Sequence, residues 1–211
     1  MKIIIQRVHK ASVSVGDQLV SSVGKGLMVL LGITHDDTKA DTIHLTNKLL
    51  NMRLWSEVKE GKSPKPWAKS AMDMNYEILI VSQFTLYHKM KGNKPDFHNA
   101  RDHEEAKDMY LEFIQMLKDI YKEDKIQMGA FGEYMNIKLE NDGPVTIALD
   151  SVKDPKIVHK LEKEEKRKAQ LSNKKKKVVT KEVKEEEKEE AKEEIEIKHK
   201  VQEGKLSLIS L

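Results

Sequence analysis

Residues 1–33 are a series of apolar and β-branched runs separated by glycines, and this pattern limits the fold more than any other stretch of the chain. Such runs are typical of β-strands, and Gly16, Gly24 and Gly26 stand where hairpin turns would connect them. The last run, at 27–31, is apolar on both faces, as expected of a central strand that is covered on both sides. We therefore predict strands at 3–5, 12–15, 19–20 and 27–31.

Two later segments have the periodicity of amphipathic helices. One begins near 36–38, where the side chains can cap a helix, and runs to about Met52. The other has apolar residues at spacings of three and four from Ala106 to Tyr121. Further strands are expected at 77–82, 126–128, 134–139 and 145–149. The order predicts an α/β fold: a mixed, largely antiparallel β-sheet forming a sandwich or barrel-like core with two helices packed on it.

Two polar stretches, 56–70 and 89–99, are predicted to be surface loops between these elements. We interpret Trp67, in the first loop, as an anchor over the core rather than as part of a lid. The second loop is basic, and Lys89 and Lys91 within it are candidates for contacts with phosphates. Such contacts give affinity without sequence preference.

The composition changes after Pro155. Lysine and glutamate dominate residues 156–200, which contain no tyrosine, phenylalanine or tryptophan. Such a stretch buries too little apolar surface to offset the chain entropy lost on ordering. We predict a folded domain at 1–153 and a charged tail at 154–211 that is disordered or helical. A second interpretation, compatible with the first, is that 163–177 is an arm that follows the phosphates of tRNA.

Composition also excludes several kinds of site. The chain has no cysteine, which excludes disulfides, thiolate catalysis and cysteine–zinc sites. Its histidines form no HExxH pattern, the single H-x-E triplet His103-Glu104-Glu105 is interpreted as the charged start of a helix, and no Walker-type glycine-rich loop is present. No run approaches the roughly 18 apolar residues of a membrane span, and the first apolar run is too short for a signal peptide. We expect a soluble, cytoplasmic protein with neither metal nor other cofactor.

Two short segments carry the strongest functional signal. Ser-Gln-Phe-Thr-Leu-Tyr at 82–87 follows the apolar run at 78–81. Asn-Asp-Gly-Pro-Val-Thr at 141–146, about sixty residues later, precedes the apolar run at 147–149. In this order they resemble the signature motifs of the D-aminoacyl-tRNA deacylases, also called D-tyrosyl-tRNA deacylases. The blocks at 5–8, 26–32 and 48–53 match in the same order, so the resemblance covers about residues 1–151.

The resemblance implies a homodimer that hydrolyses the ester bond between a D-amino acid and tRNA. Gly143-Pro144 would form a cis peptide bond, which X-Pro bonds adopt more readily than others, and would be inserted into the active site of the partner subunit. There its backbone carbonyls would exclude an L side chain. Because such a selector cannot reject an amino acid without a side chain, we also expect hydrolysis of glycyl-tRNA.

The resemblance also implies roles for individual residues. The segment 82–85 would enclose the terminal adenosine and the scissile ester, with backbone N–H groups stabilising the oxyanion. Arg7 would hold the Gly143-Pro144 turn, and Phe131 and Met135 would form an apolar wall for the adenine. The catalytic candidates are thus Ser82, Gln83, Phe84, Thr85, Gly143 and Pro144, and the substrate-binding candidates are Arg7, Phe131, Met135, Asn141, Lys89 and Lys91.

Thr85 is the obvious side-chain nucleophile, but a threonine hydroxyl needs an activating base, and no local His-Asp arrangement is evident. A route in which the 2′-hydroxyl of the terminal ribose helps to activate water needs no protein nucleophile, and we favour it.

Two other functions stay open at this point. The chain could be a non-catalytic RNA-binding or assembly module on the same fold, although the intact segment 82–85 argues against that. It could also be an editing hydrolase for L-aminoacyl-tRNA, which would have no need of Gly143-Pro144.

Overall fold

The computed structural model describes residues 1–151, 159 and 163. The predicted domain boundary at 153 and nearly all of the predicted tail lie outside the described residues. The main strands are β1 (Lys2–Val15), β2 (Gln18–Val23), β3 (Gly26–Gly32), β6 (Glu77–Ser82), β9 (Ile126–Met128) and β10 (Met135–Asp150). The α-helices are α1 (Lys39–Asn51), α2 (Ala71–Met74) and α3 (His103–Ile120), and the 3-10 helices are η1 (Phe84–Tyr87) and η2 (Glu123–Lys125).

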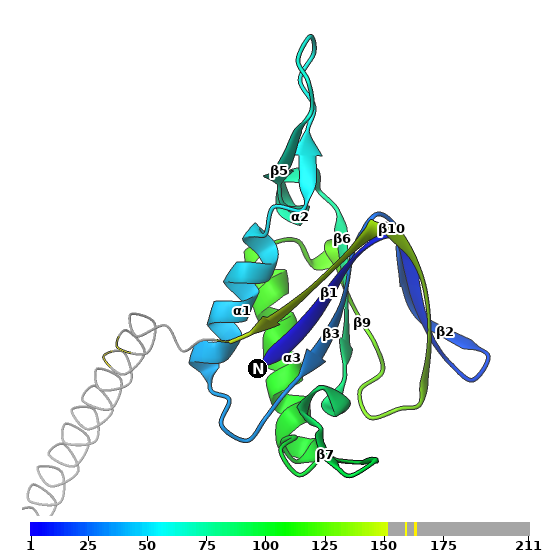
Figure 1. Ribbon diagram of the computed structural model, residues 1–211, viewed down its shortest axis with the longest axis vertical. Coiled ribbons are helices and arrows are strands. Elements are labelled where there is room, and N and C mark those ends of the chain that lie inside the picture. Colours follow the sequence, from blue (N-terminus) through cyan, green and yellow to red (C-terminus); the bar gives the residue numbers. More distant parts are fainter. Residues whose placement is uncertain (152–158, 160–162, 164–211) are drawn as a thin grey trace, which may run out of the picture. The chain divides into compact units, whose positions relative to one another are not determined.

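A six-stranded sheet organises the domain, with the order β10-β1-β3-β6-β9 and with β2 also paired to β1. The pairs made by β1 are antiparallel, whereas β3–β6 and β6–β9 are parallel. The long strands β1 and β10 bend together, so the sheet curls into a nearly closed barrel (Figure 1). The mixed, barrel-like α/β fold predicted from the sequence is confirmed.

Several predicted strand boundaries were wrong. The runs at 3–5 and 12–15 belong to the single strand β1, and those at 134–139 and 145–149 belong to the single strand β10. The pairing of β1 with β10 shifts register between Arg7 and Lys10: Arg7 pairs with Val145 and Val8 with Asn141. The Gly143-Pro144 turn is therefore a bulge within β10 and does not separate two strands. The helix α2, with four residues, is too short to produce a periodic pattern and was not predicted.

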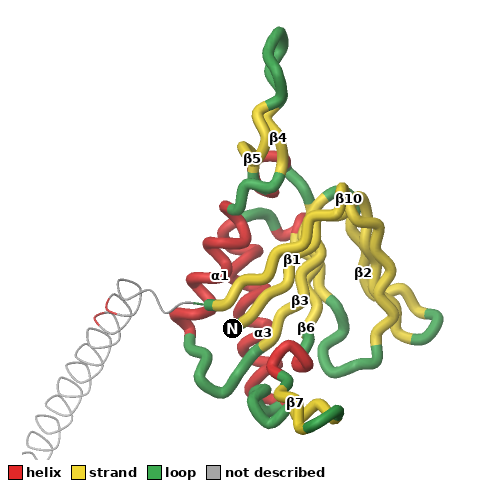
Figure 2. The backbone as a smooth tube through the Cα atoms, viewed as in Figure 1, coloured by secondary structure: helices red, strands yellow, loops and turns green. Residues whose placement is uncertain are grey.

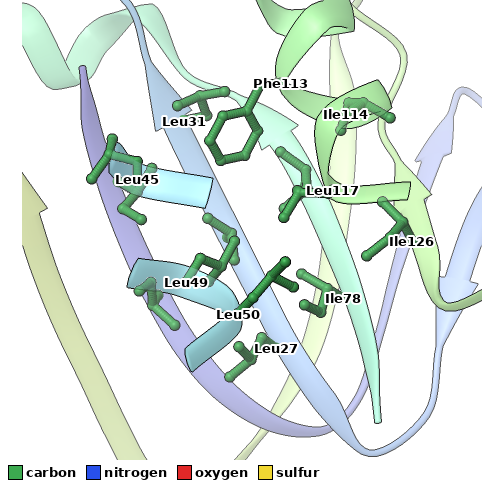
Figure 3. Close-up of a cluster of buried hydrophobic side chains, with 14 of the residues drawn as sticks. Leu27, Leu31, Leu45, Leu49, Leu50, Ile78, Phe113, Ile114, Leu117 and Ile126 are labelled. Atoms are coloured by element: carbon green, nitrogen blue, oxygen red, sulfur yellow. The ribbon is translucent and has the colours of Figure 1, made fainter. Parts of the chain in front are cut away.

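The two long helices cover one face of the sheet. Leu45, Leu49 and Leu50 of α1 and Phe113 and Leu117 of α3 pack against inward-facing residues of the strands (Figure 3). Burial of each such side chain contributes about 2 kcal/mol. On the opposite face, a second cluster forms where the sheet closes on itself; its members are Val8, Ala11, Val13, Val23, Met28, Leu79 and Val81. The strand β3 contributes to both clusters, as its sequence predicted.

Two predicted loops are β-hairpins (Figure 2). The first consists of β4 (Trp55–Glu57) and β5 (Lys65–Lys69), and the second of β7 (Lys89–Lys91) and β8 (Lys94–Asp96). Our interpretation of Trp67 as a core anchor was wrong, because its side chain is 57% exposed. Within the described part of the chain, no helix has the length and apolar character needed to cross a membrane.

Candidate active site

The first signature segment begins where β6 ends. Ser82 pairs with Leu31 of β3, and the backbone N–H of Gln83 still donates to the Leu31 carbonyl oxygen at 2.8 Å. The chain then turns into η1, which packs closely over Gly32: a Cβ there would lie 2.9 Å from the Cβ of Leu86. The absent side chain at Gly32 therefore lets the segment fold back over the end of the sheet. This is the carboxyl end of a parallel strand, where open α/β sheets commonly bind ligands.

A cavity of about 630 Å³ opens beside this turn. Ser82, Gln83 and Phe84 form one side of it, and Phe131 and Met135 line it as well. The structure thus brings together five of the residues that the sequence analysis assigned to the site. The Phe131 ring is held between two other rings, lying 5.2 Å from that of His103, which also lines the cavity, and 5.3 Å from that of the buried Tyr110, centroid to centroid.

Thr85 is placed differently from its neighbours, because it is not among the residues that line the cavity. Its hydroxyl oxygen accepts a hydrogen bond of 2.6 Å from Nε2 of Gln83. An amide nitrogen cannot accept a proton as a general base. The described contacts of Thr85 therefore give no support to its activation as a nucleophile.

The second signature segment lies within β10, beside Arg7. Nε of Arg7 donates to the main-chain oxygen of Asp142 at 3.2 Å, and Nη1 donates to the main-chain oxygen of Leu54. Gly143 has a φ of +87°, and a Cβ there would lie 3.0 Å from Nη2 of Arg7, so only glycine fits this turn without adjustment.

The cis peptide bond that the resemblance implied for this turn is not found. The described residues contain no cis peptide bond, so Gly143-Pro144 is trans in this structure. Asn141, at the start of the segment, pairs with Val8 across the β1–β10 ladder and is exposed, away from the cavity residues.

The two signature segments do not meet within one chain. Gly143 and Pro144 are not among the residues that line the cavity. Arg7, beside the turn, pairs with Leu27 at the start of β3, whereas Ser82 pairs with Leu31 near its end. Four residues of a strand span about 13 Å. The turn and the cavity therefore lie toward opposite ends of the same strands.

The two predicted phosphate-binding lysines lie on the β7–β8 hairpin. Lys89 and Lys91 are both exposed, but Lys91 forms an ion pair with Asp96, and His98 contacts the same carboxylate. The pKa of Asp96 is lowered, chiefly by the hydrogen bond from Lys91. The carboxylate of Asp96 thus neutralises the charge of Lys91 within the hairpin, which leaves Lys89 as the more available of the two predicted phosphate contacts.

Sequence reasoning missed one wall of the cavity, formed by Arg101, Asp102 and His103 at the start of α3. Arg101 is held in place, because its Nη2 donates to the main-chain oxygens of His35 at 2.6 Å and Asp37 at 2.7 Å. Gly132, with a φ of +81°, approaches His103 so closely that a Cβ would lie 2.6 Å from Nε2. The feature of the sequence that could have indicated this wall is Asp102-His103, a capping residue and a histidine at the start of a predicted helix. In the described part of the chain, no group of three or more His, Cys, Asp or Glu side chains could hold a metal ion.

Comparisons with known proteins agree with these features. The family model described as D-Tyr-tRNA(Tyr) deacylase matches residues 4–150. The chain is 47% identical over 174 residues to D-aminoacyl-tRNA deacylase 1 of Homo sapiens, an alignment that covers 80% of this chain and 81% of that protein. It is 52% identical over 151 residues to D-aminoacyl-tRNA deacylase of Drosophila melanogaster, covering 72% of this chain and 92% of the relative.

Solved structures show the same fold. One, titled "c-Myc DNA Unwinding Element Binding Protein", superposes with a TM-score of 0.67 at 47% identity and covers 72% of this chain and 99% of its own. Another, titled "Structural Analysis of a probable eukaryotic D-amino acid tRNA deacylase", has a TM-score of 0.60 at 20% identity, covering 71% of this chain and 98% of its own, and is similar in fold.

Proposed function

Because the chain belongs to the D-Tyr-tRNA(Tyr) deacylase family, we infer that it is a hydrolase that cleaves the ester bond between a D-amino acid and tRNA. The observation that carries this inference is the cavity at the end of β6, where the segment 82–84 faces Phe131 and Met135. Aromatic and apolar walls suit an adenine ring, and the polar side chains of Ser82 and Gln83 suit the ester. The enzyme would release free D-amino acid and tRNA in the cytoplasm, as a quality-control step of translation.

We further propose that the enzyme acts as a homodimer in which Gly143-Pro144 of one subunit enters the cavity of the other. The separation of the two signature segments within one chain supports this arrangement, because a second copy can supply the turn that the cavity lacks. Arg7 supports it by holding the turn from behind. The backbone carbonyls of the turn would face the α-carbon of the substrate and exclude an L side chain sterically, which a trans peptide bond does not preclude.

In the proposed chemistry, water attacks the ester carbonyl carbon and the bond to the ribose 3′-oxygen breaks, that oxygen receiving a proton. The adjacent 2′-hydroxyl assists by orienting the water and relaying the proton. The N–H of Gln83 is engaged with Leu31. The N–H of Phe84 opens a helix, has no acceptor within it and belongs to a residue that lines the cavity, so it is the candidate for stabilising the oxyanion.

Hydrolysis of paired D- and L-tyrosyl-tRNA, with and without EDTA, tests the function. Rapid loss of only the D ester, unaffected by chelator, is the expected result. Loss of both esters would mean that Gly143-Pro144 is not a chiral selector. Loss of neither would favour the non-catalytic RNA-binding module.

Sedimentation of the same preparation tests the dimer, and Phe131→Ala tests the cavity. That variant should raise KM for the D ester about tenfold, because stacking on an aromatic ring contributes that much to binding of a base. The matched control is Leu111→Ala on the exposed side of α3, which should leave KM unchanged.

A further inference from the structure

The β4–β5 hairpin has no role in the proposed function. It projects from the domain well beyond the sheet and helices (Figures 1 and 2). Its base is firmly attached, because Trp55 is only 8% exposed and its ring packs edge-on against Tyr76 at 5.2 Å. The backbone N–H of Leu54 also donates to the Lys69 carbonyl oxygen at 2.9 Å. The hairpin is therefore an anchored arm with a solvent-exposed outer part.

The outer part of the arm is basic. Residues 55–69 contain four lysines and two glutamates. Glu57 pairs with Lys59 at 3.2 Å and with Lys69 at 3.1 Å. Within the described part of the chain, Lys62 and Lys65 are exposed and form no ion pair. Two ammonium groups on the arm are thus available to an anionic partner.

An exposed tryptophan accompanies these lysines. Trp67 follows Lys65 by two residues, is 57% exposed, and has a φ of +53°, a backbone conformation that is unfavourable for a bulky residue. An exposed indole beside free lysines is the combination by which proteins hold single-stranded nucleic acid, with bases stacked on the ring and phosphates bound by the cations. A protein partner would also accept the indole, but the surplus of lysine favours a polyanion.

Arg7 links the base of the arm to the Gly143-Pro144 turn. The same guanidinium group donates to Leu54, at the base of the arm, and to Asp142, next to Gly143. The arm and the turn are therefore held together by one side chain. In the proposed dimer, a partner subunit that receives the turn in its cavity would therefore have the arm close to that cavity.

We propose that the β4–β5 hairpin is a tRNA-binding arm that acts in trans, with Trp67 stacking on an unpaired base of the 3′ end and Lys62 and Lys65 binding its phosphates while the ester lies in the partner's cavity. This inference rests on the proposed function. It adds that each subunit contributes both a selector and an arm to the active site of the other.

The first test compares D-tyrosyl-tRNA with D-tyrosyl-adenosine, which fills the cavity but has no chain to reach the arm. The double variant Lys62→Glu/Lys65→Glu should raise KM for the tRNA at least tenfold, and Trp67→Ala about fivefold to tenfold. Both variants should keep KM for D-tyrosyl-adenosine within twofold of the parent. The charge-matched control is Lys48→Glu/Lys107→Glu on the exposed faces of α1 and α3.

Salt dependence provides a second readout of the same variants. Removing two phosphate contacts to a single strand should reduce the slope of log KM against log salt by about 1.4. An unchanged slope, an unchanged KM for the tRNA, or an equal loss on both substrates would overturn the proposal.

Binding without catalysis separates this inference from the proposed function. The chain has two tryptophans, and only Trp67 is exposed. Uncharged tRNA should therefore quench the fluorescence of the parent but not that of Trp67→Phe. Quenching in a preparation that hydrolyses no D ester would refute the deacylase function and retain the arm. No quenching in an active preparation would refute the arm and retain the function.

Mixed dimers test action in trans. One subunit carries a disabled cavity, Gln83→Ala/Phe131→Ala, and the two subunits carry different affinity tags. Placing Lys62→Glu/Lys65→Glu on the disabled subunit should raise KM for tRNA, because the active cavity then faces a defective arm. Placing the same substitutions on the active subunit should leave KM as in the parent. The opposite pattern, or a monomeric protein, would overturn the trans arrangement.

Discussion

Arg7 and Asp142 are joined twice: Nε of Arg7 lies 3.2 Å from the main-chain oxygen of Asp142 and 3.2 Å from its carboxylate Oδ2. The guanidinium group also bonds to Leu54. Its planar set of donors can satisfy several acceptors at once, which an ammonium group on a flexible chain does with less geometric control. The Arg7 side chain thus links its own strand to two segments that are distant in the sequence.

Replacing Arg7 with lysine should lower kcat/KM for D-tyrosyl-tRNA about 100-fold, because a displacement of roughly 1 Å at the reacting centre has an effect of that size. The melting temperature should change by only a few degrees. The matched control is Lys10→Ala on the same strand, which removes an exposed ion pair with Glu140 and should leave activity unchanged. An Arg7→Lys enzyme with parental kinetics would show that the turn needs no support from Arg7.

Thr85→Ala should keep kcat within about fivefold of the parent, because the hydroxyl of Thr85 contacts Gln83 rather than a base. Removal of a true nucleophile would instead lower kcat by about 10⁴-fold to 10⁶-fold. Single-turnover kinetics with D-tyrosyl-tRNA distinguish these values. A near-total loss in a protein with an unchanged circular dichroism spectrum would restore the covalent mechanism.

Glycyl-tRNA should be hydrolysed at high enzyme concentration, because a selector made of backbone carbonyls excludes a side chain and glycine has none. Deacylation is followed with labelled glycyl-tRNA beside L-alanyl-tRNA, which carries one methyl group more and should persist. Complete resistance of glycyl-tRNA would contradict a purely steric selector.

Gly26→Ala should lower the free energy of unfolding by about 2–3 kcal/mol, since an added methyl group overlaps the main-chain oxygen of Glu77 across the β3–β6 ladder. Gly16→Ala is the control. Its Cβ would meet nothing within 4 Å, and only the positive φ of +56° opposes it, a cost of about 1 kcal/mol. Urea denaturation measures both, and equal losses would show that the ladder relaxes around the methyl group.

Asp41 should make stability depend on acid pH. Burial alone would raise the pKa of Asp41, but hydrogen bonds from Ser151 and Thr38 outweigh it and the pKa is lowered from 3.8. A lowered folded-state pKa gives stability that is present above the unfolded value and is lost as pH falls through the folded value. Asp41→Asn also weakens the helix cap made with Thr38, whose N–H donates to the carboxylate at 2.8 Å.

Asp41→Asn should therefore cost about 1 kcal/mol at pH 7. Denaturation of parent and variant between pH 7 and pH 2 should show this difference shrinking below about pH 4. Glu104→Gln, an exposed substitution in the first turn of α3, serves as the control. A difference that is constant across the range would mean that the carboxylate charge of Asp41 has no part in the stability.

Local patterns predicted much of the fold. The helix from Thr38 and the helix ending near Tyr121 were expected from caps and periodicity, which depend on residues a few positions apart. Local patterns also led us to predict β1 and β10 as two strands each and to place Trp67 over the core. Those errors share a cause: a bulge that bends a long strand looks like a turn, and an apolar residue on a projecting hairpin looks like one in the core.

By itself, the sequence determined the local elements, the apolar faces of the central strands and the residues of the two signature segments, because each depends on neighbours along the chain. The family resemblance implied that Phe131 and Gln83 share a site, whereas only the tertiary structure decided that His103 lies in the same wall. It also decided that Arg7 holds Gly143 away from the cavity of its own chain. These placements follow from the long-range pairing of β1 with β3 and β10. A local sequence pattern does not specify which distant strand a given strand will pair with.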